Sequence, residues 1–316
     1  MKTYLLQRLG IAALTLFGMS LVIFALLRLA PGDIVDILFS AGGYVNASER
    51  AAIEKELGID RPVWVQYLDW IRHMVTGDLG KSYRYDLPAW EIIRPLLPIT
   101  LELATLSMIV AVLLGVPTGV ISAVRQDTVL DYVLRVVSLA GLSMPSFWLG
   151  MVIILALVAW IGWIPPMTYV PASENFKLHA IQFILPAMAV GYRSSALIMR
   201  ITRSALLEVM REDYIRTARA KGVAGGAVIL KHALKNALIP LITLAGLQLP
   251  LVFSGALVAE TVFTWPGMGR LFVDSIGYRD YPVLMGLLML TAVMVVLGNF
   301  LADLVYAAVV PRVRLS

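Results

Sequence analysis

The sequence predicts an all-α polytopic membrane protein with six transmembrane helices. Hydrophobic residues make up 59% of its 316 residues and charged residues 15%, and the mean hydropathy is +0.82. Apolar runs long enough to cross a hydrocarbon core of ~30 Å recur along the chain, whereas a soluble protein of this length would interrupt them with polar faces. The sequence has no cysteine, which excludes disulfides, thiolate nucleophiles and cysteine-bound metals.

The first apolar run, residues 9–30, is predicted to be an uncleaved membrane anchor. Lys2 and Arg8 precede it, as basic residues precede a secretory signal, but the run is long for a signal peptide and the segment Arg28–Pro31 makes a poor cleavage site. Five further spans are predicted: Ile99–Val124, Arg135–Trp160, Phe183–Met199, Ala237–Ala259 and Pro282–Ala307. Residues 99–307 are therefore expected to form the core transmembrane domain.

The distribution of basic residues predicts the orientation in the membrane. Residues 200–236, between the fourth and fifth spans, carry eight lysines and arginines against three acidic residues, and basic segments beside spans tend to stay in the cytoplasm. Six crossings then place both termini, residues 1–8 and 308–316, in the cytoplasm and the long loop 31–98 outside. The net charge of +5 is attributed to cytoplasmic loops that face anionic membrane lipid, and nucleic acid is set aside as a partner.

The external loop 31–98 is predicted to contain short amphipathic helices. Ser48 can cap a first helix that ends at Gly58, and Pro62 suits the first position of a second helix. We expect the apolar face of the second helix to pack on the mouth of the protein rather than to rest on the bilayer interface. That face consists of Trp64, Tyr67, Leu68, Ile71, Met74 and Val75.

Gly80, Lys81 and Ser82 match the end of a phosphate-binding P-loop, but the rest of the motif is missing. The motif requires a glycine five residues before its second glycine, and that position holds Val75. No other Walker motif occurs in the sequence. If ATP powers this protein, a separate subunit must hydrolyse it.

The cytoplasmic loop 200–236 is predicted to fold as a helix, a turn and a helix. Arg203–Lys221 has apolar residues at spacings of three and four, Gly222 can cap it, Val223–Gly226 can turn, and Ala227–Ala237 can lead as a helix into the fifth span. Small residues beside basic ones suit docking into a groove on another protein. A basic hairpin at the lipid surface that only fixes the topology fits the same pattern equally well.

Motifs along the chain point to a family. The cytoplasmic loop carries the set Tyr214, Ala218, Ala220, Lys221, Gly222, His232, Ala233, Asn236, Ala237 and Pro240. Weaker motifs lie at Gly77–Gly80, Met144–Trp148, Glu260–Phe263 and Pro266–Gly269. In these motifs the chain resembles, over almost its whole length, the permease subunits of binding-protein-dependent ABC importers, in the dipeptide, oligopeptide and nickel branch. The cytoplasmic set is similar to that branch's form of the EAA loop, although Arg216 stands where the general motif has glutamate.

The resemblance implies a type I ABC importer permease fold in a bacterial inner membrane. It also implies three kinds of partner: a second homologous permease subunit, two ATP-binding subunits that hold ATP and magnesium, and an extracytoplasmic substrate-binding protein. No cofactor is expected on this chain. Short peptides are the first expected substrate, and nickel complexes, glutathione, opines or oligosaccharides would fit the same scaffold. Coupling to the ATPase is assigned to Tyr214, Arg216, Ala218, Arg219, Ala220, Lys221 and Gly222.

Polar residues inside the spans are the candidates for the translocation pathway, because ionisable groups are costly at membrane depth. Arg193, with Ser194 beside it, can line the pathway or extend toward the cytoplasm, and Pro145 can kink a helix beside the pathway. Three carboxylates near span ends are expected to be interfacial or to form structural pairs: Glu102, Glu260 and Asp303.

The main alternative function is an ion-gradient-driven secondary transporter or channel. Such proteins usually place carboxylates or broken helices at the membrane midplane, and the middle of every predicted span lacks an acidic pair. An intramembrane enzyme is not expected, because no nucleophile, base and orienting partner occur together at one depth and no metal-ligand cluster is apparent. No catalytic residue and no metal ligand are assigned.

Overall fold

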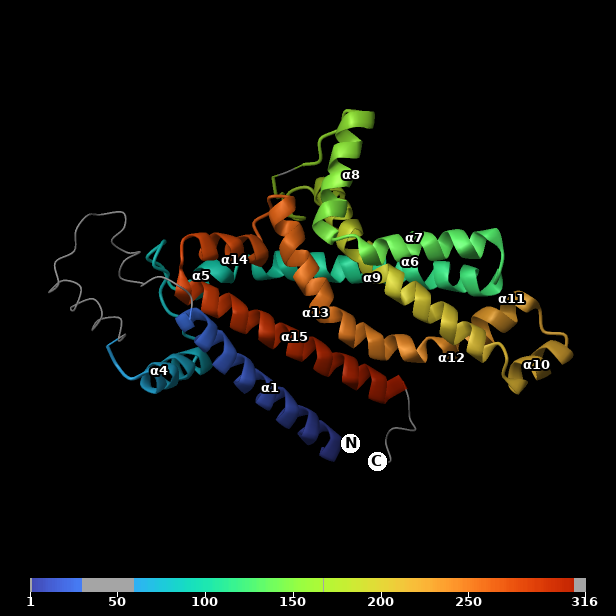
Figure 1. The fold of residues 1–316 in the computed structure, drawn as a ribbon, viewed down its shortest axis with the longest axis horizontal. Helices are drawn as coiled ribbons and strands as arrows, with labels where there is room; N and C mark the ends of the chain where they lie inside the picture. The colour runs from blue at the N-terminus through green and yellow to red at the C-terminus, as the bar shows by residue number, and fades with distance from the viewer. Residues whose placement is uncertain (1, 30–59, 167, 310–316) are drawn as a thin grey trace. The chain divides into compact units, whose positions relative to one another are not determined.

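The computed structural model describes residues 2–29, 60–166 and 168–309, which are mostly helical (Figure 1). Among these residues, β-type pairing is confined to an isolated antiparallel bridge between Lys81 and Pro88. They form two compact units, Met1–Pro98 with Leu271–Val296 and Ile99–Arg270 with Leu297–Ser316. The predicted all-α fold class is confirmed.

The first unit joins the N-terminal span to the helix predicted to lie outside the membrane. α1 runs over Lys2–Leu29, and α4 runs over Val63–Val75 with Pro62 immediately before it. The two helices meet where the Phe24 ring packs edge-on against Tyr67, with ring centroids 5.4 Å apart, and where Ser20 Oγ lies 2.8 Å from Tyr67 Oη. The other predicted external helix, between Ser48 and Gly58, lies outside the described residues.

The apolar face of α4 is only partly used in this contact. Tyr67 packs on α1, and the Trp70 ring lies 5.9 Å from the Phe24 ring. Trp64, Leu68 and Val75, by contrast, are 67%, 53% and 81% exposed. An exposed apolar stripe on a short amphipathic helix is compatible with a bilayer interface or with a further protein surface, so the predicted packing of this face on the mouth of the protein stays a prediction.

The segment that mimics a P-loop is a structural tie within the first unit. Ser82 Oγ donates a hydrogen bond to the Asp280 carboxylate, and the Tyr83 amide donates a second at 3.2 Å. This tie connects the stretch before α5 (Ala89–Ile93) to the stretch between α14 (Met268–Gly277) and α15 (Tyr281–Val309). Ser82 and Asp280 are both buried, so the serine serves to hold the fold.

Two long helices, α6 (Leu97–Val124) and α9 (Phe176–Val209), form the centre of the second unit. Their backbones approach closely because glycines lie at the contact. A Cβ atom on Gly119 would lie 2.7 Å from the Met199 carbonyl oxygen, and one on Gly115 would lie 2.7 Å from the Ser195 carbonyl oxygen. Small residues at such positions let membrane helices pack tightly.

The third predicted span, Arg135–Trp160, is not one continuous helix. It is divided into α7 (Val129–Ser143) and α8 (Ser146–Ile161), which are bent by 110° relative to each other, and Figure 1 shows α8 leaving the line of α7. The break falls at Met144, which is extended (φ −91°, ψ 131°) because the following Pro145 disfavours helical backbone before it. A single span over Arg135–Trp160 stays a prediction, and the kink that the sequence suggests at Pro145 is present as this break.

The apolar helices occupy the predicted positions along the chain, but fewer than six of the described helices are long enough to cross a membrane. Four described helices are long and apolar enough to cross a membrane: Leu6–Leu29 of α1, α6, α9 and Tyr281–Leu304 of α15. The bent pair α7 and α8 adds a fifth if it counts as one broken span. The remaining predicted span falls in α13 (Ile239–Val262), of which Gln248–Val262 is a shorter apolar stretch. Six crossings stay a prediction.

Candidate functional site

The predicted cytoplasmic loop begins with a break in the helix. α9 ends at Val209 and α10 occupies Asp213–Ala220, so the prediction of one helix over Arg203–Lys221 was wrong. The backbone leaves the helical conformation at Glu212 (φ −66°, ψ 147°).

A turn and a second helical run follow α10, as predicted. Gly222 has φ +77°, the left-handed conformation that glycine commonly adopts just after a helix. The second run comprises α11 (Gly225–Ala227), the π-helical turn η1 (Val228–Ala233) and α12 (Leu234–Ala237). It leads directly into α13, which has a proline in its first turn. We call residues 213–237 the coupling segment.

The coupling segment is anchored to α6 and α9 by an apolar core. Ile215 of α10 is fully buried, in one cluster with Leu206 of α9 and Ala123 of α6. The second helical run contributes Val228, Ala233 and Ala237 to the same cluster. Burying a side chain such as isoleucine contributes about 1.5–3 kcal/mol, so the segment is held firmly by these contacts. The apolar core therefore connects α10 to α6 and α9.

The residues predicted to contact an ATPase lie mainly on the outer surface of α10 and the turn after it. Ala218 is partly buried and packs against the apolar core. Tyr214 is 42% exposed, and its Oη accepts a hydrogen bond from Asn236 Nδ2 at 2.8 Å. The other five predicted residues are exposed: Arg216, Arg219, Ala220, Lys221 and Gly222. The arrangement presents a basic surface on a rigid support.

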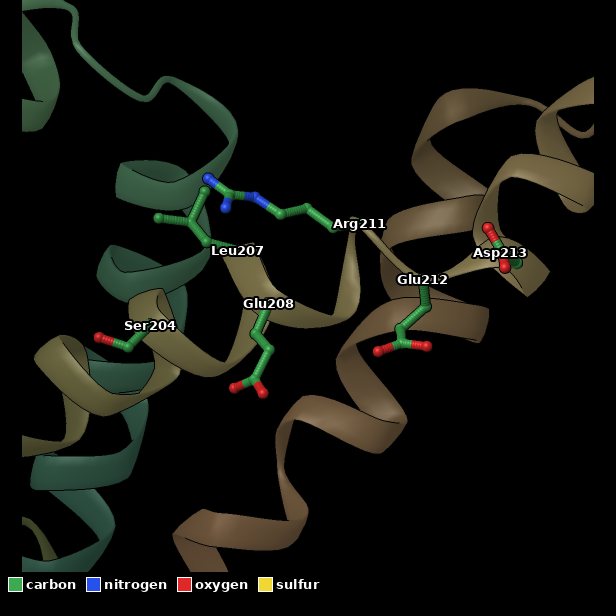
Figure 2. A pocket seen from close by; sticks show the side chains of 6 residues that line it. All are labelled: Ser204, Leu207, Glu208, Arg211, Glu212 and Asp213. Carbon is green, nitrogen blue, oxygen red and sulfur yellow. The ribbon is translucent and has the colours of Figure 1, made fainter.

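A polar hollow of about 440 Å³ opens where α9 ends, beside the coupling segment. Figure 2 shows the Glu208 and Glu212 carboxylates directed to the same side, with Arg211 extended alongside Leu207. The hollow is lined by Ser204, Leu207, Glu208, Arg211, Glu212 and Asp213. Charged residues around an open hollow are typical of the rim of a protein–protein contact rather than of an enclosed, mostly apolar ligand site.

An ion pair that the sequence did not predict joins α9 to α7, next to the apolar core of the coupling segment. Arg203 of α9 donates from Nε to Asp131 Oδ1 at 3.0 Å and from Nη2 to Asp131 Oδ2 at 2.8 Å. Asp131 belongs to the first turn of α7 and is fully buried. A signal was present in the sequence, because Thr128 and Asp131 form the Thr-x-x-acid pattern of a helix start, and Thr128 Oγ1 accepts from the Asp131 amide at 3.4 Å.

The three residues predicted to line the pathway differ in their surroundings. Arg193 is exposed on α9, Ser194 beside it is buried, and Pro145 is exposed at the N-cap of α8. Within the described part of the chain, no hydrogen bond or ion pair joins them to one another. The structure thus places Arg193 on an outward-facing surface of α9 and Ser194 in the packed interior.

Glu260 and Glu102, two carboxylates near span ends, have hydrogen-bond partners. Glu260 is fully buried; its carboxylate accepts hydrogen bonds from Thr100 Oγ1 and from the Gly269 amide, both at 2.6 Å. Glu102 Oε1 lies 2.7 Å from His179 Nε2. Glu260 thus serves the packed interior, whereas the Glu102 side chain is 41% exposed and pairs with a buried histidine. No group of three or more His, Asp or Glu in the described residues could hold a metal ion.

Comparison with known proteins places the chain in a family. Residues 115–315 match the family described as "Binding-protein-dependent transport system inner membrane component", and residues 1–104 match the corresponding N-terminal family. The chain is 40% identical over 337 residues to the dipeptide transport system permease protein DppB of Escherichia coli (strain K12), with 99% of each chain covered. It is 39% identical over 317 residues to the oligopeptide transport system permease protein AppB of Bacillus subtilis (strain 168), covering 99% of this chain and 100% of that one.

The fold is also similar to that of a solved transporter. The chain aligns with a structure of the MetNI methionine ABC transporter in an inward-facing conformation with a TM-score of 0.56 and 22% identity, covering 69% of this chain and 96% of that chain. This likeness concerns the fold alone and confirms the predicted type I ABC importer permease fold. The predicted resemblance to the dipeptide and oligopeptide branch is confirmed by the sequence matches. The protein therefore belongs to the family of binding-protein-dependent transport system inner membrane components.

Proposed function

We propose that this protein is a transmembrane permease subunit of an ATP-driven importer and forms half of a translocation pathway for short peptides or a related small solute. Family membership and full-length similarity to dipeptide and oligopeptide permeases support this proposal. The observation that carries it is the coupling segment, a helical hairpin with a buried apolar side and an exposed basic side. A hairpin that only fixed the topology would not need this rigid support.

The proposed complex contains four kinds of subunit. This chain pairs with a second homologous permease, two ATP-binding subunits dock on the cytoplasmic side, and an extracytoplasmic binding protein delivers the substrate. ATP and magnesium are held by the ATP-binding subunits, and this chain performs no catalytic step. The exposed basic residues Arg216, Arg219 and Lys221 support a docking surface on α10.

We place the chain in a bacterial inner membrane with both termini, residues 1–8 and 308–316, in the cytoplasm. Loop 31–98 is then external, and residues 99–307 form the core transmembrane domain, which includes the cytoplasmic loop 200–236. The excess of lysine and arginine in that loop supports this orientation. Arg193 lines the pathway in this proposal, because an exposed charge within a membrane-spanning helix is far less costly beside water than beside lipid.

Transport follows from alternating access. ATP binding closes the ATPase pair and moves the coupling segment, the segment moves α6 and α9 through the apolar core, and the pathway opens outward. Hydrolysis returns the complex to the inward-open state.

Co-expression with the neighbouring genes tests this proposal. The chain should co-elute with ATP-binding subunits and a second permease, and ATP hydrolysis by the reconstituted complex should rise when a peptide-loaded binding protein is added. The matched control is the same binding protein without peptide. Uptake by the chain alone under an ion gradient, without ATP, would instead establish a secondary transporter.

A further inference from the structure

A buried cluster ties three helices together next to the coupling segment. The Asp131 carboxylate of α7 receives the two hydrogen bonds from Arg203 of α9, one from Ser122 Oγ of α6, and one at 3.1 Å from the Asp127 amide in the turn between α6 and α7. We call these four residues the Asp131 clamp. The Arg203 side chain is 18% exposed and that of Asp131 is fully buried.

The clamp and the apolar core of the coupling segment use neighbouring residues of the same helices. On α6, Ser122 belongs to the clamp and the next residue, Ala123, belongs to the core. On α9, Arg203 belongs to the clamp, and Ala205 and Leu206 belong to the core. Ile215 of α10 therefore packs against α6 and α9, which the clamp already joins to α7. α7 itself contributes no residue to that core.

Further contacts join α7 to α9 toward its other end. Ser138 Oγ donates to the Ala196 carbonyl oxygen at 3.1 Å, and Tyr192 Oη donates to the Val137 carbonyl oxygen at 2.5 Å. α7 is thus fixed to α9 at its start and in its middle, and it ends at the 110° bend into α8. Following the chain from Asp131, this bend between α7 and α8 is the first change of direction.

We infer that Asp131 is a positioning residue that makes α7 move as one rigid body with the coupling segment. A displacement of α10 then also displaces α7 and changes the angle between α7 and α8 at the bend before Pro145. This inference rests on the proposed function, because it concerns how that function is transmitted. Removing one partner from a buried ion pair leaves an uncompensated charge, so the two helices stay joined while neighbouring elements rearrange. The conformational change is then concentrated at the bend.

A distance measurement in the assembled transporter tests the rigid body directly. The chain has no cysteine, so spin labels can be attached at Val129→Cys on α7 and Leu230→Cys in the coupling segment without removing other thiols from this chain. Both positions are exposed, at 80% and 65%. The label-to-label distance should be the same with and without ATP. A second pair, Val129→Cys with Trp160→Cys at the exposed end of α8, should change its distance between the two states.

The clamp itself is tested by Asp131→Asn in the reconstituted complex. We expect the ratio of ATP hydrolysed to peptide imported to rise by roughly tenfold, within the usual range for loss of a coupling interaction, while the KM for ATP stays unchanged. Replacing both partners, Asp131→Asn with Arg203→Gln, removes the unpaired charge, so this variant should assemble at least as well as the single one and should keep the raised ratio. The matched control is Asp69→Asn, which breaks the exposed Arg61–Asp69 ion pair and should leave the ratio unchanged.

The outcomes separate this inference from the proposed function. If the loaded binding protein does not stimulate ATP hydrolysis by the wild-type complex, the proposed function is contradicted. A wild-type complex that is stimulated, but in which the Val129–Leu230 label distance changes with ATP, contradicts the rigid body alone. If Asp131→Asn does not assemble, the label distances in the otherwise wild-type complex still test whether α7 and the coupling segment move as one rigid body. An unchanged ratio in assembled Asp131→Asn also overturns the inference.

Discussion

Tyr214 Oη accepts a hydrogen bond from Asn236 Nδ2 at 2.8 Å, which joins α10 to α12 at the outer surface of the coupling segment. The two halves of the hairpin are therefore connected twice, by this bond and by the apolar core around Ile215. The core contact is buried and the hydrogen bond is exposed, so the two connections should differ in what they contribute to stability and to coupling.

Loss of the Tyr214–Asn236 hydrogen bond should have a small effect. Tyr214→Phe is expected to lower the stability of the complex by about 0.5–1.5 kcal/mol, the usual net value of one hydrogen bond. Asn236→Ala should cost a similar amount, and the double variant should cost little more than either single one, because both remove the same bond. Thermal unfolding of the purified complex measures the three values, and strictly additive losses would show that the side chains act separately.

Substitution of Gly222 should impair coupling without preventing membrane insertion. A leucine at this position must adopt the left-handed conformation, at a cost of about 1–2 kcal/mol, and adds bulk to the exposed turn. We expect Gly222→Leu to keep hydrolysing ATP while peptide uptake falls. Gly226→Leu is the matched control, because Gly226 lies in the helical α11 and a Cβ there meets no atom within 4 Å. Undiminished uptake by assembled Gly222→Leu would refute the assignment.

The contact between α6 and α9 should not tolerate a single added methyl group. Gly119→Ala would bring a Cβ atom to 2.7 Å from both the Met199 carbonyl oxygen and Thr202 Cβ, so the helices must separate, at a cost of about 1–3 kcal/mol. Gly10→Ala in α1 is the control, since nothing lies within 4 Å of its added Cβ. Fluorescence-detected gel filtration after heating should show aggregation of Gly119→Ala at a lower temperature, and equal behaviour of the two variants would contradict the tight contact.

The buried Glu260 should be needed for its hydrogen bonds rather than for transport chemistry. Glu260→Ala removes the acceptor of the hydrogen bonds from Thr100 Oγ1 and the Gly269 amide, and an unsatisfied buried Gly269 amide costs about 1–3 kcal/mol. Glu260→Gln keeps one acceptor oxygen and should lose less. Protease resistance of the assembled complex measures the order, with the exposed Glu174→Gln as control. Equal resistance of the alanine and glutamine variants would show that these bonds contribute little.

The sequence predicted the elements that depend on composition and local backbone preference. Apolar runs located the helices, and Gly222 marked the end of α10 because few other residues adopt a positive φ there. Pro145 marked the kink because proline restricts the residue before it. The family resemblance rested on short motifs in order, and full-length similarity to known permeases confirmed it.

Other features depend on contacts between distant residues, which periodicity does not reveal. The break at Glu212 lets Ile215 reach Leu206, and no spacing rule predicts that contact. The Asp131 clamp joins residues 72 positions apart in sequence, and only the Thr128–Asp131 pattern gave a local sign of it. Trp70 was not included in the predicted apolar stripe of α4, yet it packs on Phe24, because it lies three residues after Tyr67 and so on the same side of the helix.

The bend between α7 and α8 has a consequence for water. α7 has 15 residues and spans about 22 Å, which is less than the ~30 Å thickness of the hydrocarbon core. The last carbonyl groups of α7 and the first amides of α8 have no partners within their own helices, and hydrocarbon cannot supply any. If the bend lies at membrane depth, solvent or a neighbouring part of the protein must satisfy these backbone groups, at a stretch of chain that carries no charged side chain.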